Sequence, residues 1–261
     1  MSDFNFSDFK SARKEMVKDQ EISHGGDSGD KGRFVSHELK AIFSVDEIFS
    51  AVSKNPTSKY EGHPFHFFKL KVEQILKQED HEPYHPKELQ DDGFSPTPVK
   101  PFKEGDLVNA FLPLPRVQKD LTSDDKKLLN KNLDYWAALF HVAPAVVDLD
   151  DAQEIAEEDG RAVVGRYVGV NYSVYEYDFE DKKTKEPVYG AKVIAHPYAV
   201  DQDTLEKVPL RGAHDVAEYL VTQHNAGAVP AEDVAEMLDY LIDIQEITEE
   251  EGADYMGSLD T

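Results

Sequence analysis

The sequence contains no cysteine, and this absence removes several classes of function. It excludes disulfide-stabilised scaffolds, thiolate nucleophiles and zinc or iron–sulfur sites built from cysteine. The chain also has no apolar run near the ~20 residues that a membrane-spanning helix needs, so we expect no membrane association. Its first residues lack the basic and apolar regions of a secretory signal. We therefore expect a cytoplasmic protein.

The usual sequence signatures of catalysis are missing as well. We find no Gly-x-x-x-x-Gly-Lys-Ser/Thr phosphate loop, no Gly-x-Gly-x-x-Gly dinucleotide loop, no Gly-x-Ser-x-Gly elbow and no His-Glu-x-x-His helix. Catalytic groups need only meet in space, so an enzyme is not excluded by this. Because nothing supports one, we favour a non-catalytic protein and expect no cofactor.

Positive charge is scarce, and it is unevenly spread. The chain has 28 Lys and Arg against 52 Asp and Glu, which gives a formal net charge of −24. No Lys or Arg follows Arg211, and this last part carries 13 carboxylates, while residues 148–159 hold seven carboxylates and no base. Such charge repels nucleic acid and anionic lipid. It is compatible with a soluble surface, an acidic docking face for a protein, or a mimic of nucleic acid.

The N-terminal third of the chain predicts a loosely organised region with short helices. Residues 33–43 have the composition of a strand. Ser44 and Glu47 then match a capping box, which predicts that a helix begins there. From Pro64 onward apolar residues recur at helical spacing and predict a second helix, although residues 65–72 also alternate as a strand would.

A proline-rich connector covers residues 78–102. Proline at this density prevents a regular helix or a central strand, so the connector predicts a boundary near residue 98. We expect three parts, which are an N-terminal region of residues 1–98, a main domain of residues 99–248, and a frayed acidic tail of residues 249–261.

The main domain is predicted to be α+β, an antiparallel sheet packed by helices and ended by a helical hairpin. The expected strands are residues 105–114, 163–179 and 188–195, together with 33–43. The expected helices are one capped by Thr122 with an apolar stripe at residues 129–140, a short acidic one at 150–158, one at 213–225, and one opened by Pro230.

The most distinctive segment is residues 162–179, where β-branched side chains alternate with aromatic and polar ones. A polar turn and the strand at 188–195 complete a long β-hairpin. If the valine face packs inward, the opposite face and the tip carry our candidate binding residues. These residues are Tyr167, Tyr175, Tyr177, Phe179, Lys182, Lys183 and Lys185.

Three interpretations of this hairpin face stay open. The tyrosines could cover a second core layer, or they could meet a protein partner or a second copy of the chain. With the lysines they could instead bind single-stranded nucleic acid, and Tyr60, Phe67, Lys69 and Lys71 could extend such a surface. The net charge of −24 disfavours nucleic acid.

The hypothesis that we favour is a non-catalytic binding or assembly protein. It would engage a protein partner, or itself, through the aromatic hairpin face or the acidic helical face. Single-stranded nucleic-acid binding is the first alternative. The second is an acidic mimic that inhibits a basic nucleic-acid enzyme.

Four of the ten histidines lie close together in the sequence, and imidazole is a good ligand for Zn²⁺ or Ni²⁺. Pro83 and Pro86 interrupt any helix that would fix the second pair. We therefore expect no bound metal and keep the four only as weak candidate ligands. They are His63, His66, His81 and His85.

Overall fold

In the residues that it describes, the structure, a computed structural model, contains one antiparallel sheet of five strands in the spatial order β3-β2-β1-β4-β5. It describes residues 32–54, 60–80, 98–116, 121–157, 162–180 and 187–259. The strands are β1 (Leu39–Val52), β2 (Pro64–Gln78), β3 (Leu107–Pro113), β4 (Tyr167–Glu180) and β5 (Pro187–Tyr198). The helices are α2 (Ser123–Phe140), the 3-10 helix η2 (Pro144–Val146), α3 (Leu149–Glu157), α4 (Ala213–Asn225), α5 (Ala231–Asp243) and α6 (Glu249–Gly257). The predicted α+β class is confirmed.

Strands β4 and β5 form the long hairpin that the alternation in residues 162–179 predicts. Their pairing runs without a register shift along the whole of β5. On β4 the side chains of Val168, Val170 and Tyr172 are buried, so the valine face does point inward. β1 pairs with β4 on one side and with β2 on the other, which places it at the centre of the sheet.

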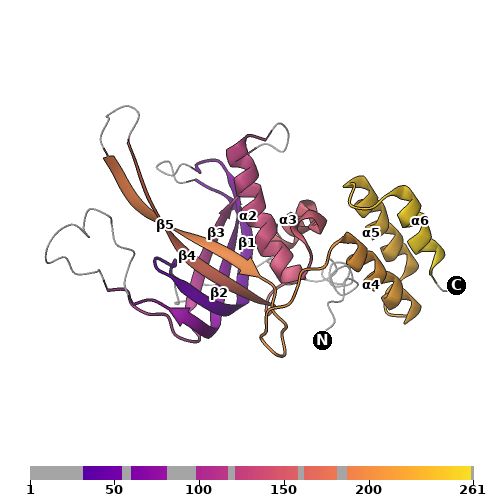
Figure 1. Ribbon diagram of the computed structural model, residues 1–261, viewed down its shortest axis with the longest axis horizontal. Coiled ribbons are helices and arrows are strands. Elements are labelled where there is room, and N and C mark those ends of the chain that lie inside the picture. Colours follow the sequence, from indigo (N-terminus) through magenta and orange to yellow (C-terminus); the bar gives the residue numbers. More distant parts are fainter. Residues whose placement is uncertain are drawn as a thin grey trace, which may run out of the picture.

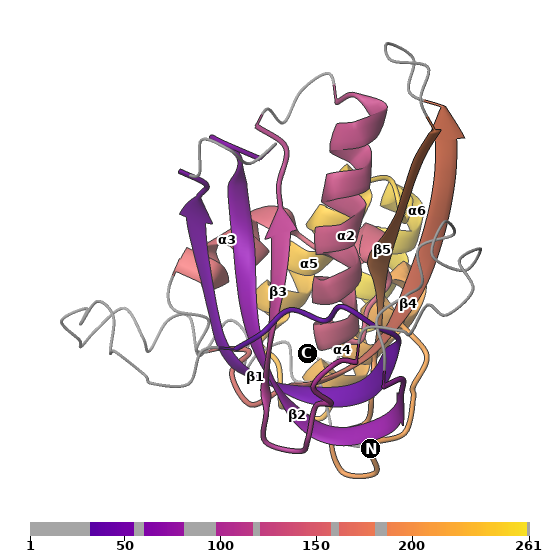
Figure 2. The ribbon, with the colours of Figure 1, turned by 90° about the vertical axis from the view of Figure 1, so that its left-hand side faces the viewer.

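Helix α2 covers one side of the sheet, and Figure 2 shows it between the edge strands β3 and β5. Its cap is the predicted one, because the Thr122 hydroxyl accepts from the N–H of Asp125 and the Asp125 carboxylate accepts from the N–H of Thr122. Trp136 is fully buried against the rings of Phe68 and Phe140. We call the side of the sheet that α2 covers the inner face and the opposite side the outer face.

Helices α4, α5 and α6 pack together at one end of the molecule (Figure 1). The predicted helical hairpin of α4 and α5 is confirmed, and Gly227 between them adopts a left-handed conformation (φ 76°). The N–H of Arg211 donates to the carbonyl of His141, and its carbonyl accepts from the N–H of Ala143, so the start of α4 is tied to the end of α2. Within the described ranges, none of the helices combines the length and the apolar character that crossing a bilayer requires.

Two predicted helices in the N-terminal third are wrong, because both segments are strands. Residues 39–52 form β1, where the Ser44 hydroxyl donates to the Glu73 carboxylate on β2 (2.6 Å) and not to a helix cap. Residues 64–78 form β2, as the alternation in residues 65–72 had allowed. Long-range pairing satisfies the backbone of both segments and overrides their local helical patterns.

The sheet takes strands from both sides of the boundary predicted near residue 98. β1 and β2 precede it, and β3, β4 and β5 follow it. Through β1 and β2 the N-terminal region is therefore part of the central sheet, where Phe43, Ile48 and Leu70 are fully buried.

The segment after residue 248, predicted as a frayed tail, begins with the helix α6. The Thr248 hydroxyl accepts from the N–H of Glu251 (3.2 Å), and the Glu251 carboxylate accepts from the N–H of Thr248 (2.7 Å). Gly252 is buried so closely against Ile242 that a Cβ atom there would lie 2.6 Å from its Cδ1. A capping box and tertiary packing thus order residues that composition alone marks as a tail.

Replacing Thr248 with alanine is expected to lower the free energy of unfolding by about 1 kcal/mol, because the substitution removes the cap of α6. Urea denaturation followed by circular dichroism measures this change. Thr222→Ala is the matched control, since the Thr222 hydroxyl only returns to the carbonyl of Glu218 within α4 and its loss should be nearly neutral. Equal stability of the two variants would mean that this cap does not stabilise the fold.

Candidate binding face

The outer face of the sheet carries Tyr167, Tyr175 and Tyr177 of the proposed binding residues, together with Phe67, Lys69 and Lys71 of the proposed extension. Along β2 the side chains alternate, so that His66 and Phe68 meet α2 on the inner face. Phe67, Lys69 and Lys71 therefore lie on the outer face. On β4 the odd-numbered residues also lie on the outer face, because the even-numbered Val168, Val170 and Tyr172 are buried on the inner face.

An aromatic patch occupies the β1–β2–β3 end of this face. Phe49 lies directly opposite Phe67, which lies opposite Phe111, so the three side chains form a row across the strands. The rings of Phe49 and Phe67 stack with centroids 5.0 Å apart, and those of Phe65 and Phe111 are 4.7 Å apart. Phe34 meets the edge of the Phe67 ring and is 60% exposed. The aromatic patch consists of Phe34, Phe49, Tyr60, Phe65, Phe67 and Phe111.

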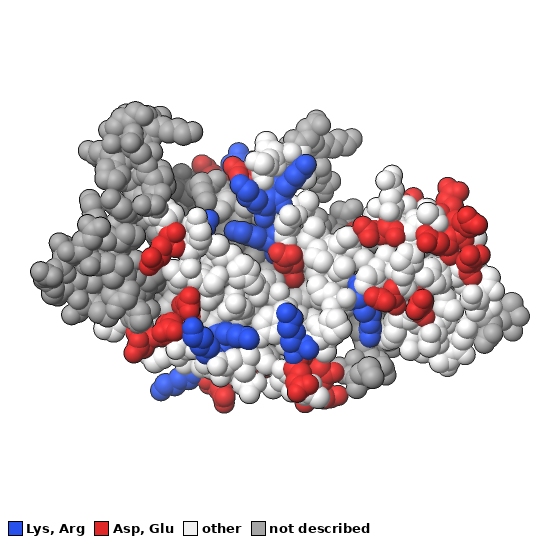
Figure 3. Space-filling model, viewed as in Figure 1, with Lys and Arg blue, Asp and Glu red and all other residues white. Residues whose placement is uncertain are grey.

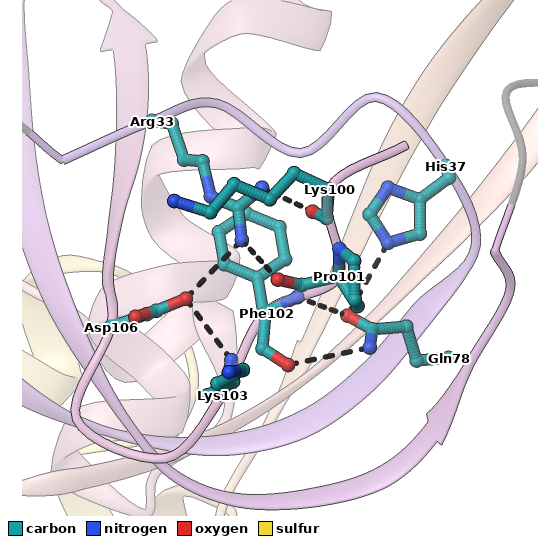
Figure 4. A network of polar contacts seen from close by, with 8 residues as sticks. All are labelled: Arg33, His37, Gln78, Lys100, Pro101, Phe102, Lys103 and Asp106. Carbon is teal, nitrogen blue, oxygen red and sulfur yellow. Dashed lines mark hydrogen bonds and ion pairs between the residues drawn. The ribbon is translucent and has the colours of Figure 1, made fainter. Parts of the chain in front are cut away.

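Arg33 anchors the segment that carries Phe34 (Figure 4). Its guanidinium donates to the carbonyls of Lys100 and Pro101 and forms an ion pair with Asp106 (3.2 Å). The same group lies 3.6 Å from the centre of the Phe102 ring. The backbone of Arg33 also bonds to β3 in both directions, because its N–H donates to Leu107 and its carbonyl accepts from Asn109.

Gln78 holds the other side of this network. Its side chain accepts from the N–H of Phe102 (2.8 Å), and the buried His37 ring stacks on Phe102 with centroids 5.8 Å apart. These contacts join the start of the described chain, the end of β2 and the segment before β3 (Figure 4). They fix the backbone next to Phe34 although its side chain is exposed.

The two lysines beside the aromatic patch on β2 are paired with carboxylates. Lys69 lies 3.5 Å from Glu47 on β1, and Lys71 lies 3.1 Å from Glu73 on its own strand. The hydrogen bond from Ser44 lowers the pKa of Glu73, so that carboxylate is charged near neutral pH. These pairs offset the positive charge on this part of the face.

The tyrosines of the hairpin lie on the same outer face. Tyr175 is 54% exposed, and the Lys192 ammonium on β5 lies 4.9 Å from the centre of its ring. Tyr167 and Tyr177 are partly buried. The interpretation that these tyrosines form a second core layer does not hold for Tyr175. The side chain of Phe179 and the whole of Lys182, Lys183 and Lys185 lie outside the described part of the structure.

The histidine pair that is described does not form a metal site. His66 is fully buried, its Nδ1 accepts from Trp136 Nε1–H (3.1 Å), and its Nε2 donates to the side chain of Gln153 (2.8 Å). His63 Nδ1 is 2.8 Å from the carbonyl of Leu114. Among the described residues no group of three or more His, Cys, Asp or Glu could hold a metal ion. His81 and His85 lie outside them.

A pocket of about 190 Å³ lies at the seam between β3, α2 and β5, and its lining includes Phe34 and Phe111 of the aromatic patch. Tyr135 and Tyr172 line it, with their hydroxyls 3.4 Å apart. Burial raises the pKa of Tyr172 to about 12 and that of Tyr135 well above its usual range, so both phenols stay protonated near neutral pH. Neither is therefore available as a base.

The acidic end of the chain lies apart from the sheet. Helices α4, α5 and α6 contain no Lys or Arg, and Figure 3 shows carboxylates over this end and most of the basic groups over the sheet and α2. The charge asymmetry along the sequence thus becomes a separation in space.

Sequence reasoning found Tyr60, Phe67 and Tyr175 but missed Phe34, Phe49, Phe65 and Phe111. Phe65 and Phe67 on β2 could have been predicted from the sequence, because they alternate with the buried residues His66 and Phe68 as the outward side chains of a strand do. Phe34 carried none, since its place beside Phe67 depends on the Arg33 network.

Comparison with known proteins gives no relative for this chain. No protein-family model, no curated protein and no solved structure matches it. The function has therefore to be inferred from the binding face itself.

Proposed function

We propose that this chain is a non-catalytic binding or assembly protein of the cytoplasm, which engages a protein partner through the aromatic patch. The observation that carries the proposal is the row Phe49–Phe67–Phe111 with the exposed Phe34 beside it. Aromatic side chains are enriched at the centres of protein interfaces, where they bury a large area at a small entropic cost.

The charges around the patch favour an apolar protein surface over nucleic acid as the partner. Lys69 and Lys71 are paired with Glu47 and Glu73, so they attract phosphate groups only weakly. Stacking of bases on an aromatic platform needs such an attraction to hold the backbone. The base-free helices α4–α6 remain the surface that the mimic hypothesis would use.

The test replaces Phe34 with aspartate, which leaves the core intact because this side chain is mostly exposed. Binding to the protein partner is expected to weaken about thirtyfold, as for the loss of a central aromatic contact. Met256→Asp is the matched control, since Met256 is exposed on α6 at the other end of the molecule. Size-exclusion chromatography with light scattering tests self-association, and quantitative co-purification tests a second protein.

Support requires one and the same partner, or a dimer of the chain, that Phe34→Asp loses and Met256→Asp keeps. A strict monomer without a co-purifying protein contradicts the proposal, and so does a partner that both variants retain. Salt-sensitive binding to oligothymidylate that is lost in Lys192→Glu would favour the nucleic-acid alternative instead.

A further inference from the structure

A second feature of the outer face is a pocket of about 390 Å³ beside the β4–β5 hairpin. Lys40, Asn171, His196 and Lys207 supply its polar lining, and Tyr198 and Leu205 are among its apolar walls. Its lining includes no carboxylate. For a chain of net charge −24, a pocket whose ionisable groups are mainly basic is an unexpected local composition.

Three of these polar residues, Lys40, Asn171 and His196, lie in one row across the sheet. Asn171 on β4 is directly opposite both Lys40 on β1 and His196 on β5. On the other side Lys40 lies opposite Lys77 of β2. Like charges opposite each other on neighbouring strands destabilise a sheet, so the stability of the fold does not account for Lys40.

Of the two lysines that lie opposite each other, Lys40 and Lys77, only Lys77 is paired with carboxylates among the described residues. Lys77 forms ion pairs with Glu38 (3.0 Å) and Glu79 (3.2 Å). In the described part of the chain no carboxylate comes within 4.0 Å of the ammonium group of Lys40 or of Lys207. The Lys207 ammonium lies 5.6 Å from the centre of the Tyr198 ring, a contact that does not neutralise its charge. The positive charges of Lys40 and Lys207 are therefore not balanced by a neighbouring carboxylate in the described part of the chain.

The apolar walls are held in place by two unusual local arrangements. The Tyr198 ring lies so close above Gly169 that a Cβ atom there would come within 2.2 Å of it. Leu205 adopts a left-handed backbone conformation (φ 58°), which costs about 1 kcal/mol or more for a residue with a side chain. Its N–H donates to the carbonyl of Asp201, and the Asp201 carboxylate accepts from Thr204 in the same loop.

We propose that this pocket binds an oxyanion, a carboxylate or a phosphate, carried on an apolar group. Lys40 and Lys207 supply the charge, and the side-chain amide of Asn171 can donate to an anionic oxygen. The Ser173 hydroxyl lies 3.0 Å from His196 Nε2 and holds the imidazole at the rim. Tyr198 and Leu205 contact the apolar part of the ligand. This site does not depend on the aromatic patch or on its partner.

The experiment titrates the full-length ¹⁵N-labelled protein with phenyl phosphate and, separately, with benzoate. We expect saturable amide shifts at Asn171 and His196 with a dissociation constant near the millimolar range, since the negative field of the whole protein opposes anions. Sodium chloride at equal ionic strength should not reproduce these shifts. The phosphate and carboxylate probes separate the two sources of the oxyanion.

The double variant Lys40→Gln/Lys207→Gln should bind at least about tenfold more weakly, because it removes both charges. Lys126→Gln on α2 is the control and should bind like the wild type. Shifts that do not saturate with either probe, or that chloride reproduces, overturn the proposal. Equal weakening by the double variant and by Lys126→Gln would also overturn it, because only the general charge would then matter.

Discussion

Trp136→Ala is expected to lower the free energy of unfolding by about 3–5 kcal/mol, the largest effect that we expect of any single substitution in this chain. The indole is fully buried, where it contacts Phe68 and Phe140 and donates its N–H to His66. Its loss opens a cavity between α2 and the sheet and leaves the His66 Nδ1 without its donor. Domains are stable by only ~5–15 kcal/mol, so this one change removes a large part of the total.

Urea denaturation followed by circular dichroism measures the effect, because the variant lacks the only tryptophan and hence its fluorescence. Trp136→Phe keeps most of the volume and should cost less, about 1–3 kcal/mol, mainly for the lost hydrogen bond. Tyr175→Ala is the control on the exposed face and should change stability by under ~0.5 kcal/mol. If the midpoint of Trp136→Ala equals that of the wild type, the helix does not pack on the sheet as described.

The protein is expected to lose stability as the pH falls below about 6.5, and His66 should account for part of that loss. Burial, the largest cause, lowers the pKa of His66 from its ordinary value of 6.5. Protonation would also place a hydrogen on His66 Nδ1, the atom that accepts the hydrogen bond from Trp136. Two donors would then face each other and this bond would be lost. In the window between the lowered folded pKa and 6.5 the unfolded state binds more protons, so stability rises with pH.

The contribution of His66 is therefore fully present above about pH 6.5 and declines as the pH falls toward the folded pKa. One group can change the free energy of unfolding by at most about 1.4 kcal/mol per pH unit. Urea midpoints at a series of pH values should fall less steeply in His66→Gln than in the wild type, even though that variant is less stable at neutral pH.

Thr222→Ala, which removes no titratable group, is the control for this series and should keep the steep profile. A residual slope is expected in every variant, because burial also lowers the pKa of His141. Parallel profiles of the wild type and His66→Gln would show that His66 is not the group that titrates.

The elements that the sequence predicted correctly are those whose signals are local. The cap at Thr122 lies within one turn of the helix that it starts, and the alternation on β4 is undisturbed because the β4–β5 register has no shift. The α4–α5 hairpin was readable for the same reason, since Gly227 and Pro230 mark its turn.

The predictions that were wrong are the helices expected in the segments that form β1 and β2, where residues bond to partners distant in the sequence and not to their neighbours. The pairing of β1 with β2 has three register shifts, which interrupt the period of two that would have revealed a strand. Ser44 and Glu47 imitate a capping box, but they contact Glu73 and Lys69 on the next strand. The capping box of α6, Thr248 with Glu251, lies within a run of carboxylates whose composition alone predicted a tail.

The sequence by itself determined the α+β class, the long β-hairpin and the base-free acidic end. It did so because caps, alternation and charge are properties of neighbouring residues. Only the tertiary structure decided which aromatics share the outer face with the hairpin tyrosines, and that Lys40, Asn171 and His196 stand in one row. Those neighbours come from different strands, and strand pairing over long sequence distances sets which side chains meet.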